Sequence, residues 1–129
     1  MKRKHEIEIR VRYQETDAQG RVHHANYFTY FEMGRVEQLR AAGVDYGDLE
    51  EQGVMLVVQR IECQYIQPAS YDDILTLKTI LQRVTPARIE HRYEVFRGEL
   101  LLAKANSTLA CIDRSGKVRR IPEWMVVQE

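Results

Sequence analysis

Residues 13–27 read Tyr-Gln-Glu-Thr-Asp-Ala-Gln-Gly-Arg-Val-His-His-Ala-Asn-Tyr, and they separate two hydrophobic patterns. Before them, residues 6–13 alternate between apolar and charged side chains, which is typical of a half-buried β-strand. From residue 26 to residue 42 the apolar side chains recur at helical spacing, and Gly43 supplies a stop signal. The segment at 14–24 is therefore predicted to be a polar loop that leads from a strand into a long helix.

The expected helix carries one continuous stripe, made of Tyr27, Tyr30, Phe31, Gly34 and Gln38. A glycine in the middle of a helix costs about 1 kcal/mol relative to alanine. On a buried stripe it has a use, because it lets a sheet approach the helix axis closely. We therefore expect the helix to lie on a sheet, with Gly34 at the contact and the aromatic side chains in the core.

The rest of the chain predicts long antiparallel strands, after a short capped helix at 45–53. The expected strands cover residues 54–67, 74–84, 88–97, 99–113 and 117–121, with turns between them. One long helix followed by consecutive strands predicts an α+β fold, in which the helix covers one face of a five- to six-stranded antiparallel sheet. The absence of a linker or repeat favours a single domain over residues 1–129.

The composition is that of an ordinary globular protein. Hydrophobic residues make up 44% of the 129 residues, and 19 basic residues balance 19 acidic ones, which argues against a dedicated nucleic-acid or membrane binder. The basic start is followed by alternating charges instead of an apolar run, so neither a secretory signal nor a transmembrane segment is expected. Cys63 and Cys111 share no metal-ligand spacing and are predicted to be free thiols in a cytoplasmic protein.

Asp17 is the residue that points to a chemistry. A carboxylate beside a helix N-terminus lies close to backbone N–H groups that can bind developing negative charge. This combination suits attack on a carbonyl, with Asp17 as general base or nucleophile and the helix end as oxyanion site. The alternative is that Asp17 is only a loop or cap residue, since aspartate is common in both roles. A metal site at His23 and His24 is a further alternative, but adjacent side chains rarely converge on one ion, so no metal is predicted.

The sequence resembles the hot-dog-fold acyl-CoA thioesterases, in the branch that includes 4-hydroxybenzoyl-CoA thioesterase and the YbgC-like enzymes. The resemblance is carried by the pattern Tyr-x-Glu-Thr-Asp-x-x-Gly-x-Val-x-His-x-Asn-Tyr from residue 13, by Tyr30-Phe31-Glu32 and Arg35, and by Pro68-Ala69-x-x-Asp72-Asp73. The order of the strands agrees along nearly the whole chain. The resemblance implies hydrolysis of a CoA thioester without a cofactor, because coenzyme A is part of the substrate.

The resemblance also implies roles for individual residues. Asp17 is expected to be the catalytic carboxylate, and Gly20 to turn the loop toward the substrate. The backbone N–H of His24 is expected to donate to the oxyanion, while its side chain positions the thioester or water. Asn26 and Tyr27 are substrate-binding candidates where the helix begins, and Asn26 is also a candidate cap or holder of the Asp17 loop.

Glu32 is a second candidate base, since a related hot-dog branch uses a carboxylate on the helix. An ion pair between Glu32 and Arg35 on the helix surface is the favoured alternative.

The phosphates of coenzyme A require basic side chains. The candidates are Arg83, Arg88, Arg114, Lys117, Arg119 and Arg120. The family resemblance implies a homodimer that joins two sheets edge to edge, and larger assemblies, often tetramers, are usual in this branch. A non-catalytic acyl-thioester-binding or scaffold protein and, last, a dehydratase remain as alternatives; the acid at Asp17 with Gly20 and His24 favours the enzyme.

Overall fold

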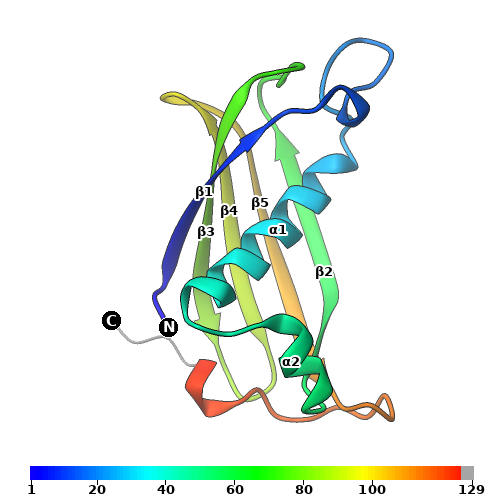
Figure 1. Cartoon of the computed structure of the whole chain (residues 1–129), viewed down its shortest axis with the longest axis vertical. Coiled ribbons are helices and arrows are strands. Elements are labelled where there is room, and N and C mark those ends of the chain that lie inside the picture. The colour runs from blue at the N-terminus through cyan, green and yellow to red at the C-terminus, as the bar shows by residue number, and fades with distance from the viewer. Residues whose placement is uncertain (126–129) are drawn as a thin grey trace.

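A five-stranded antiparallel sheet curves around one long helix in the computed structural model, which describes residues 1–125 (Figure 1). The strands are β1 (Lys4–Arg10), β2 (Met55–Tyr65), β3 (Ile74–Val84), β4 (Ile89–Arg97) and β5 (Leu100–Ile112), and their order in the sheet is β1-β3-β4-β5-β2. The helices are α1 (Asn26–Ala41) and α2 (Tyr46–Glu51), with single 3₁₀ turns at Tyr13–Glu15 and Glu123–Met125. The predicted α+β architecture is confirmed, with five strands.

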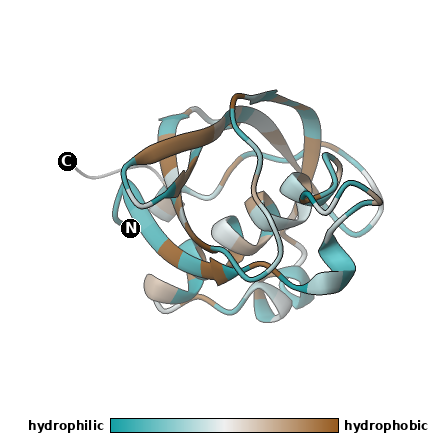
Figure 2. Ribbon diagram, turned by 90° about the horizontal axis from the view of Figure 1, so that it is seen from above, coloured by the Kyte–Doolittle hydropathy of each residue, from teal (hydrophilic) through white to brown (hydrophobic). Residues whose placement is uncertain are grey.

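Helix α1 buries the stripe that the sequence predicted. Tyr30 and Phe31 are fully buried, and Tyr27 is almost so. A Cβ added to Gly34 would lie 2.7 Å from Cδ2 of Leu77 and would also overlap Oγ1 of Thr79. The sheet therefore approaches the helix backbone at Gly34, as expected, and Figure 2 shows α1 enclosed by the curve of the sheet.

The end of α1 is fixed by its backbone. Gly43 has a φ of +82°, and the N–H of Val44 donates to the carbonyl of Leu39 at 3.0 Å. This bond and the positive φ make a Schellman motif, which satisfies carbonyls that the helix end would leave open. The predicted stop at Gly43 is confirmed.

Two apolar clusters fill the space between α1 and the sheet. One lies along the N-terminal half of α1 and includes Tyr30, Phe31, Leu75, Tyr93 and Leu102. The other lies toward the C-terminal half and includes Leu39, Leu49, Leu81, Leu109 and Met125. Helix α2 closes the second cluster through Leu49, and the carboxylate of Asp45 caps that helix at the N–H of Asp48, 3.2 Å away.

Two of the predicted strands differ from those in the structure: one ends early, and the other is not formed. The strand expected at 6–13 ends at Arg10, because the chain turns at Tyr13–Glu15 and leaves the Tyr13 side chain 78% exposed. The strand expected at 117–121 is reduced to one bridge between Ile112 and Val118. There the N–H of Ile121 donates to the carbonyl of Pro86 at 2.8 Å, which draws this segment toward the β3–β4 turn and away from the sheet.

Strand β2 is one edge of the sheet, and β1 is the other. Val57, Val58 and Tyr65 on β2 expose 37%, 48% and 45% of their surface. Within residues 1–125, no helix has both the length and the apolar character needed to cross a membrane.

Candidate active site

Residues 17–21, called the Asp17 turn below, form a tight hairpin before α1. The N–H of Asp17 donates to the carbonyl of Arg21 at 2.8 Å, and the N–H of Gly20 donates to the carbonyl of Asp17 at 2.9 Å. Gly20 has a φ of +79°, in the left-handed region that favours glycine. The predicted turning role of Gly20 therefore agrees with the backbone.

The carboxylate of Asp17 is held through one of its two oxygens. Oδ1 accepts hydrogen bonds from the N–H groups of Gln19 at 2.9 Å and Arg21 at 3.3 Å. Oδ2 accepts none from the part of the chain that the structure describes, and the side chain is partly exposed. One oxygen thus fixes the orientation of the group, and the other is free to accept a proton or to attack a carbon.

The segment between β2 and β3 supports the Asp17 turn from below. The N–H of Val22 donates to the carbonyl of Ala69 at 2.8 Å, and Arg21 and Ser70 form an antiparallel bridge. Asp73 shapes this support, because its Oδ2 accepts from the N–H of Ser70 and from Nη1 of Arg97, each at 2.9 Å. The two motifs that carry the family resemblance, at residues 13–27 and 68–73, are therefore in direct contact in the fold.

Glu15 anchors the loop from within, a role that the sequence analysis missed. Its side chain is only 6% exposed; Oε1 accepts from the N–H of Arg12 at 2.8 Å and from the hydroxyl of Tyr30 at 2.9 Å, and Oε2 accepts from Nε of Arg12 at 3.1 Å. Burial, and then the hydrogen bond to Glu15, raise the pKa of Tyr30, so its phenol stays protonated. Only the tertiary contact with α1 reveals this role.

The entry to α1 is held by backbone groups and by His23. The carbonyl of His23 accepts from the N–H of Asn26 at 2.9 Å, and Nδ1 of His23 accepts from the N–H of Ala25 at 3.1 Å. The N–H of His24 makes no hydrogen bond within residues 1–125, so it is open to an incoming acceptor, as the oxyanion role requires. The side chain of His23 therefore supports the helix entry, while the N–H of His24 stays open.

The predicted role of Asn26 as the cap of α1 is wrong. Ala25 is the N-cap residue of α1, no side chain caps the helix, and Asn26 already lies in the first turn. Its Nδ2 is buried and has no hydrogen-bond partner among the residues described. That Asn26 holds the Asp17 loop stays a prediction.

Tyr65 on strand β2 reaches the same helix end. Its hydroxyl donates to the carbonyl of His24 at 2.8 Å, and its ring centroid lies 5.2 Å from that of Tyr27. Tyr27 itself is 3% exposed and forms part of the core wall, with Tyr30 on its other side. No local pattern indicated this role of Tyr65, because a tyrosine at the end of a strand is common and its partner is 41 residues away.

The predicted ion pair between Glu32 and Arg35 is wrong. Arg35 turns inward, and its Nη1 donates to the hydroxyl of Tyr93 at 3.0 Å. Glu32 is exposed and forms no ion pair within the part of the molecule described, and it lines a cavity beside the second apolar cluster. The buried hydroxyl of Tyr93 needs a donor, and Arg35 is the residue of α1 that supplies it.

The basic candidates for the CoA phosphates lie at the end of the molecule opposite the Asp17 turn (Figure 1). Arg114 and Arg119 support the end of α2, since they donate to the carbonyls of Glu51 at 2.9 Å and Gly53 at 3.1 Å. The side chains of Lys117 and Arg120 donate to no group within residues 1–125. Arg83 and Arg88 flank the β3–β4 turn at the same end. Within one chain, none of these residues comes near Asp17.

Comparison with known proteins supports the family resemblance seen in the sequence, along almost the whole chain. The model of the thioesterase-like superfamily matches residues 11–128. The acyl-CoA thioesterase YbgC of Haemophilus influenzae is 37% identical over 114 residues, which span 88% of this chain and 83% of that protein. A solved structure from Aquifex aeolicus is 36% identical with a TM-score of 0.90, over 93% of this chain and 94% of that one. The DHNA-CoA thioesterase of Staphylococcus aureus is 29% identical with a TM-score of 0.89, over 95% and 83% of the two chains. The chain is therefore an enzyme of the thioesterase-like superfamily and has the hot-dog fold.

Proposed function

We propose that this protein hydrolyses acyl-CoA thioesters at the Asp17 turn. The observation that supports the proposal most is the carboxylate of Asp17, which is held through Oδ1 and leaves Oδ2 free. The relatives whose printed names state acyl-CoA thioesterase activity favour the same reaction. A thioester is activated toward attack, so a base or nucleophile together with an oxyanion site can be sufficient.

In the proposed reaction, the thioester carbonyl lies between Asp17 and the start of α1. Oδ2 of Asp17 takes a proton from water as the water oxygen adds to the carbonyl carbon, or it adds to that carbon itself and forms an anhydride that water then opens. The carbonyl oxygen becomes negative and accepts the open N–H of His24, with the positive end of α1 adding to the stabilisation. On the first route the carbon–sulfur bond then breaks, and the thiolate of CoA takes the proton from Asp17. On the second route this bond breaks as the anhydride forms, and the thiolate takes a proton from the water that later opens the anhydride.

We also propose that two chains pair through their β2 edges. An exposed edge strand with apolar side chains is an aggregation hazard unless another strand covers it. Tyr65 lies on this edge and holds the carbonyl of His24, so pairing would place the helix entry at the interface. Because two β2 strands would pair in opposite directions, the basic far end of one chain would approach the Asp17 turn of its partner. Its free cations, Lys117 and Arg120, could then meet the CoA phosphates.

Release of free thiol from a panel of aliphatic and aromatic acyl-CoAs tests the proposed reaction. We expect equimolar CoA and free acid, at a rate that depends on the acyl group and requires no added metal. Binding of acyl-CoA without turnover of any member of the panel would contradict catalysis and favour an acyl-binding or scaffold protein. Sedimentation equilibrium tests the assembly, and a monomer at working concentrations would contradict the β2 pairing.

A further inference from the structure

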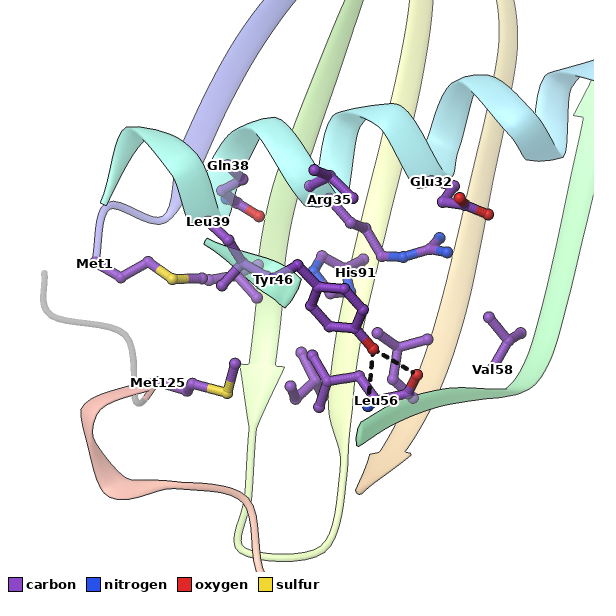
Figure 3. A pocket seen from close by; sticks show the side chains of 14 residues that line it. Met1, Glu32, Arg35, Gln38, Leu39, Tyr46, Leu56, Val58, His91 and Met125 are labelled. Carbon is purple, nitrogen blue, oxygen red and sulfur yellow. Dashed lines mark hydrogen bonds between the residues drawn. The ribbon is translucent and has the colours of Figure 1, made fainter. Parts of the chain in front are cut away.

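A cavity of about 290 Å³ lies beside the C-terminal half of α1, within the second apolar cluster (Figure 3). Its walls come from α1, α2 and the four strands β2–β5, and none of its lining residues belongs to the Asp17 turn. Most of the lining is apolar, and Leu39, Leu81 and Leu109 are almost fully buried. Apolar walls with a few convergent polar groups are typical of sites for small molecules, whose volumes begin at about 300 Å³.

Arg35 brings a positive charge into this cavity. Its Nη1 donates to the hydroxyl of Tyr93 at 3.0 Å, and that hydroxyl is 2.5 Å from Oγ of Ser107. No carboxylate within residues 1–125 forms an ion pair with Arg35. A guanidinium carries five N–H donors, so most of the donors of Arg35 have no acceptor within residues 1–125.

His91 is the second polar group of the cavity. It is 5% exposed, and its buried Nδ1 has no hydrogen-bond partner among the residues that the structure describes. Burial, and then the charge of Arg35, lower the pKa of His91 to about 3, so the ring is neutral at physiological pH and offers one donor and one acceptor. A buried polar atom without a partner is unfavourable, because it has lost its hydrogen bonds to water and gained none in return. A ligand that supplied the partner would recover part of that cost.

We propose that this cavity binds a small organic anion, a carboxylate on an apolar body, with the carboxylate against Arg35 and His91. The planar guanidinium matches the two oxygens of a carboxylate, and the neutral imidazole can donate its N–H to one of them. The leucine walls take the apolar body. Among the described residues, Glu32 is the only acidic one in the lining, and it is exposed, so it weakens the attraction without cancelling it.

Calorimetric titration of the full-length protein with octanoate and with octanamide tests the proposal. The two probes share an apolar chain and differ in charge. We expect octanoate to bind about tenfold more tightly or better, because a charged hydrogen bond to Arg35 is lost in the amide. Equal affinities, or no binding of either probe, would overturn the proposal.

Variants locate the ligand. Arg35→Gln is expected to reduce the affinity for octanoate to that for octanamide. Arg40→Gln is the matched control, because Arg40 is on the same helix, exposed and paired with Glu37, and it is expected to bind octanoate like the wild type. If Arg35→Gln does not fold, Glu32→Gln provides a second test of the proposal. Removal of this negative charge should raise the affinity for octanoate and leave the affinity for octanamide unchanged. Unchanged octanoate binding in a folded Arg35→Gln, or in Glu32→Gln, contradicts the assignment.

The carboxylate has two possible sources, a free acid and the distal end of an acyl chain. Turnover of adipoyl-CoA and hexanoyl-CoA separates them, and this comparison rests on the proposed function. If the acyl chain enters the cavity, Arg35→Gln lowers kcat/KM for adipoyl-CoA about tenfold relative to hexanoyl-CoA. If the ligand is a free acid, this ratio stays constant while octanoate binding is lost. Calorimetry on Asp17→Asn separates the anion site from the proposed catalytic function. Octanoate should still bind to this variant, even if the variant no longer hydrolyses acyl-CoA.

Discussion

Two turns of this protein have the same backbone and different surroundings. In the Asp17 turn, Oδ1 accepts from the N–H groups two and four residues later, and Gly20 has a φ of +79°. In the turn at residues 113–117, called the Asp113 turn below, Oδ1 of Asp113 accepts from Ser115 at 2.9 Å and Lys117 at 3.0 Å, and Gly116 has a φ of +85°. The N–H of each aspartate also donates to the carbonyl of the residue four positions later, at 2.8 Å. A hydrogen-bonded aspartate before a turning glycine is thus a structural device, and it does not by itself indicate catalysis.

The difference lies in what each turn faces. The Asp17 turn is anchored on Ala69 and leads into α1, where the N–H of His24 is open. The Asp113 turn caps a hairpin at the other end of the molecule, and its carboxylate also accepts from the hydroxyl of Ser115 at 2.6 Å. That hydroxyl, and then the N–H of Lys117, lower the pKa of Asp113. The comparison teaches that the same local motif becomes a candidate catalytic group only beside an oxyanion site.

Parallel substitution of the two aspartates gives the largest expected effect. Asp17→Asn should lower kcat by about 10²- to 10⁴-fold, because the amide cannot act as a general base. Asp113→Asn should leave kcat unchanged, although it alters an identical turn. Steady-state kinetics on the best acyl-CoA, with circular dichroism to confirm folding, measure both. Equal effects of the two variants would show that Asp17 has only a structural role.

Displacement of α1 should disturb one turn and spare the other. Gly34→Leu places a side chain against Leu77 and Thr79, so we expect overpacking to cost about 1–3 kcal/mol in the free energy of unfolding. Activity should fall as well, because the proposed oxyanion site lies at the start of α1. Thr29→Leu adds the same side chain on the exposed face of α1 and is the control. Urea denaturation that gives the same midpoint for both variants would contradict the close contact at Gly34.

Alanine at the two turning glycines separates stability from function. Gly20→Ala and Gly116→Ala should each cost about 1–2 kcal/mol, because both residues require a positive φ and neither added Cβ meets a neighbour. Only Gly20→Ala should reduce kcat. If Gly116→Ala reduced kcat to the same extent, the Asp113 turn would have to contribute to catalysis, and the contrast between the turns would fail.

The free cations at the far end test whether the Asp113 turn serves the partner's substrate. Lys117→Gln with Arg120→Gln should raise KM for acyl-CoA and weaken its dependence on salt, since exposed charges are screened within about 10 Å at 0.1 M. Turnover of a short thioester without the nucleotide should not change. Arg83→Gln with Arg88→Gln is the comparison at the β3–β4 turn. An unaltered KM and salt dependence in the first pair would exclude the Asp113 turn as the phosphate site.

The smallest expected effect concerns pH and stability. The pKa of Asp113 is lowered in the folded state, so its contribution is present above the pKa of the unfolded chain and is lost as pH falls through the lowered value. Asp113→Asn should therefore be less stable than the wild type at pH 7, and the difference should shrink in acid. Urea midpoints of the two proteins across this range measure it. A difference that is constant with pH would contradict ionic stabilisation of this turn.

Several features of the molecule could be predicted from local sequence. The helix stripe, the stop at Gly43, the turn at Gly20 and the cap at Asp45 each depend on residues within about one turn of each other, so periodicity and backbone preferences indicate them. Gly34 could be predicted as a contact point because its cost within a helix required a compensating close approach. The strand at 117–121 was mispredicted, since its pairing with β5 stops after one bridge and the N–H of Ile121 donates to the carbonyl of Pro86 in the β3–β4 turn.

By itself, the sequence determined the α+β class, the place of Asp17 and Gly20 before the helix, and the family. Tertiary structure decided which polar groups meet across the fold. Tyr65 holds His24, Glu15 holds Tyr30, and Arg35 turns from Glu32 to Tyr93. The physical reason is that a buried donor or acceptor takes whichever partner the packing brings within about 3 Å. That partner lies 15 to 58 residues away in these three pairs, where no local pattern can indicate it.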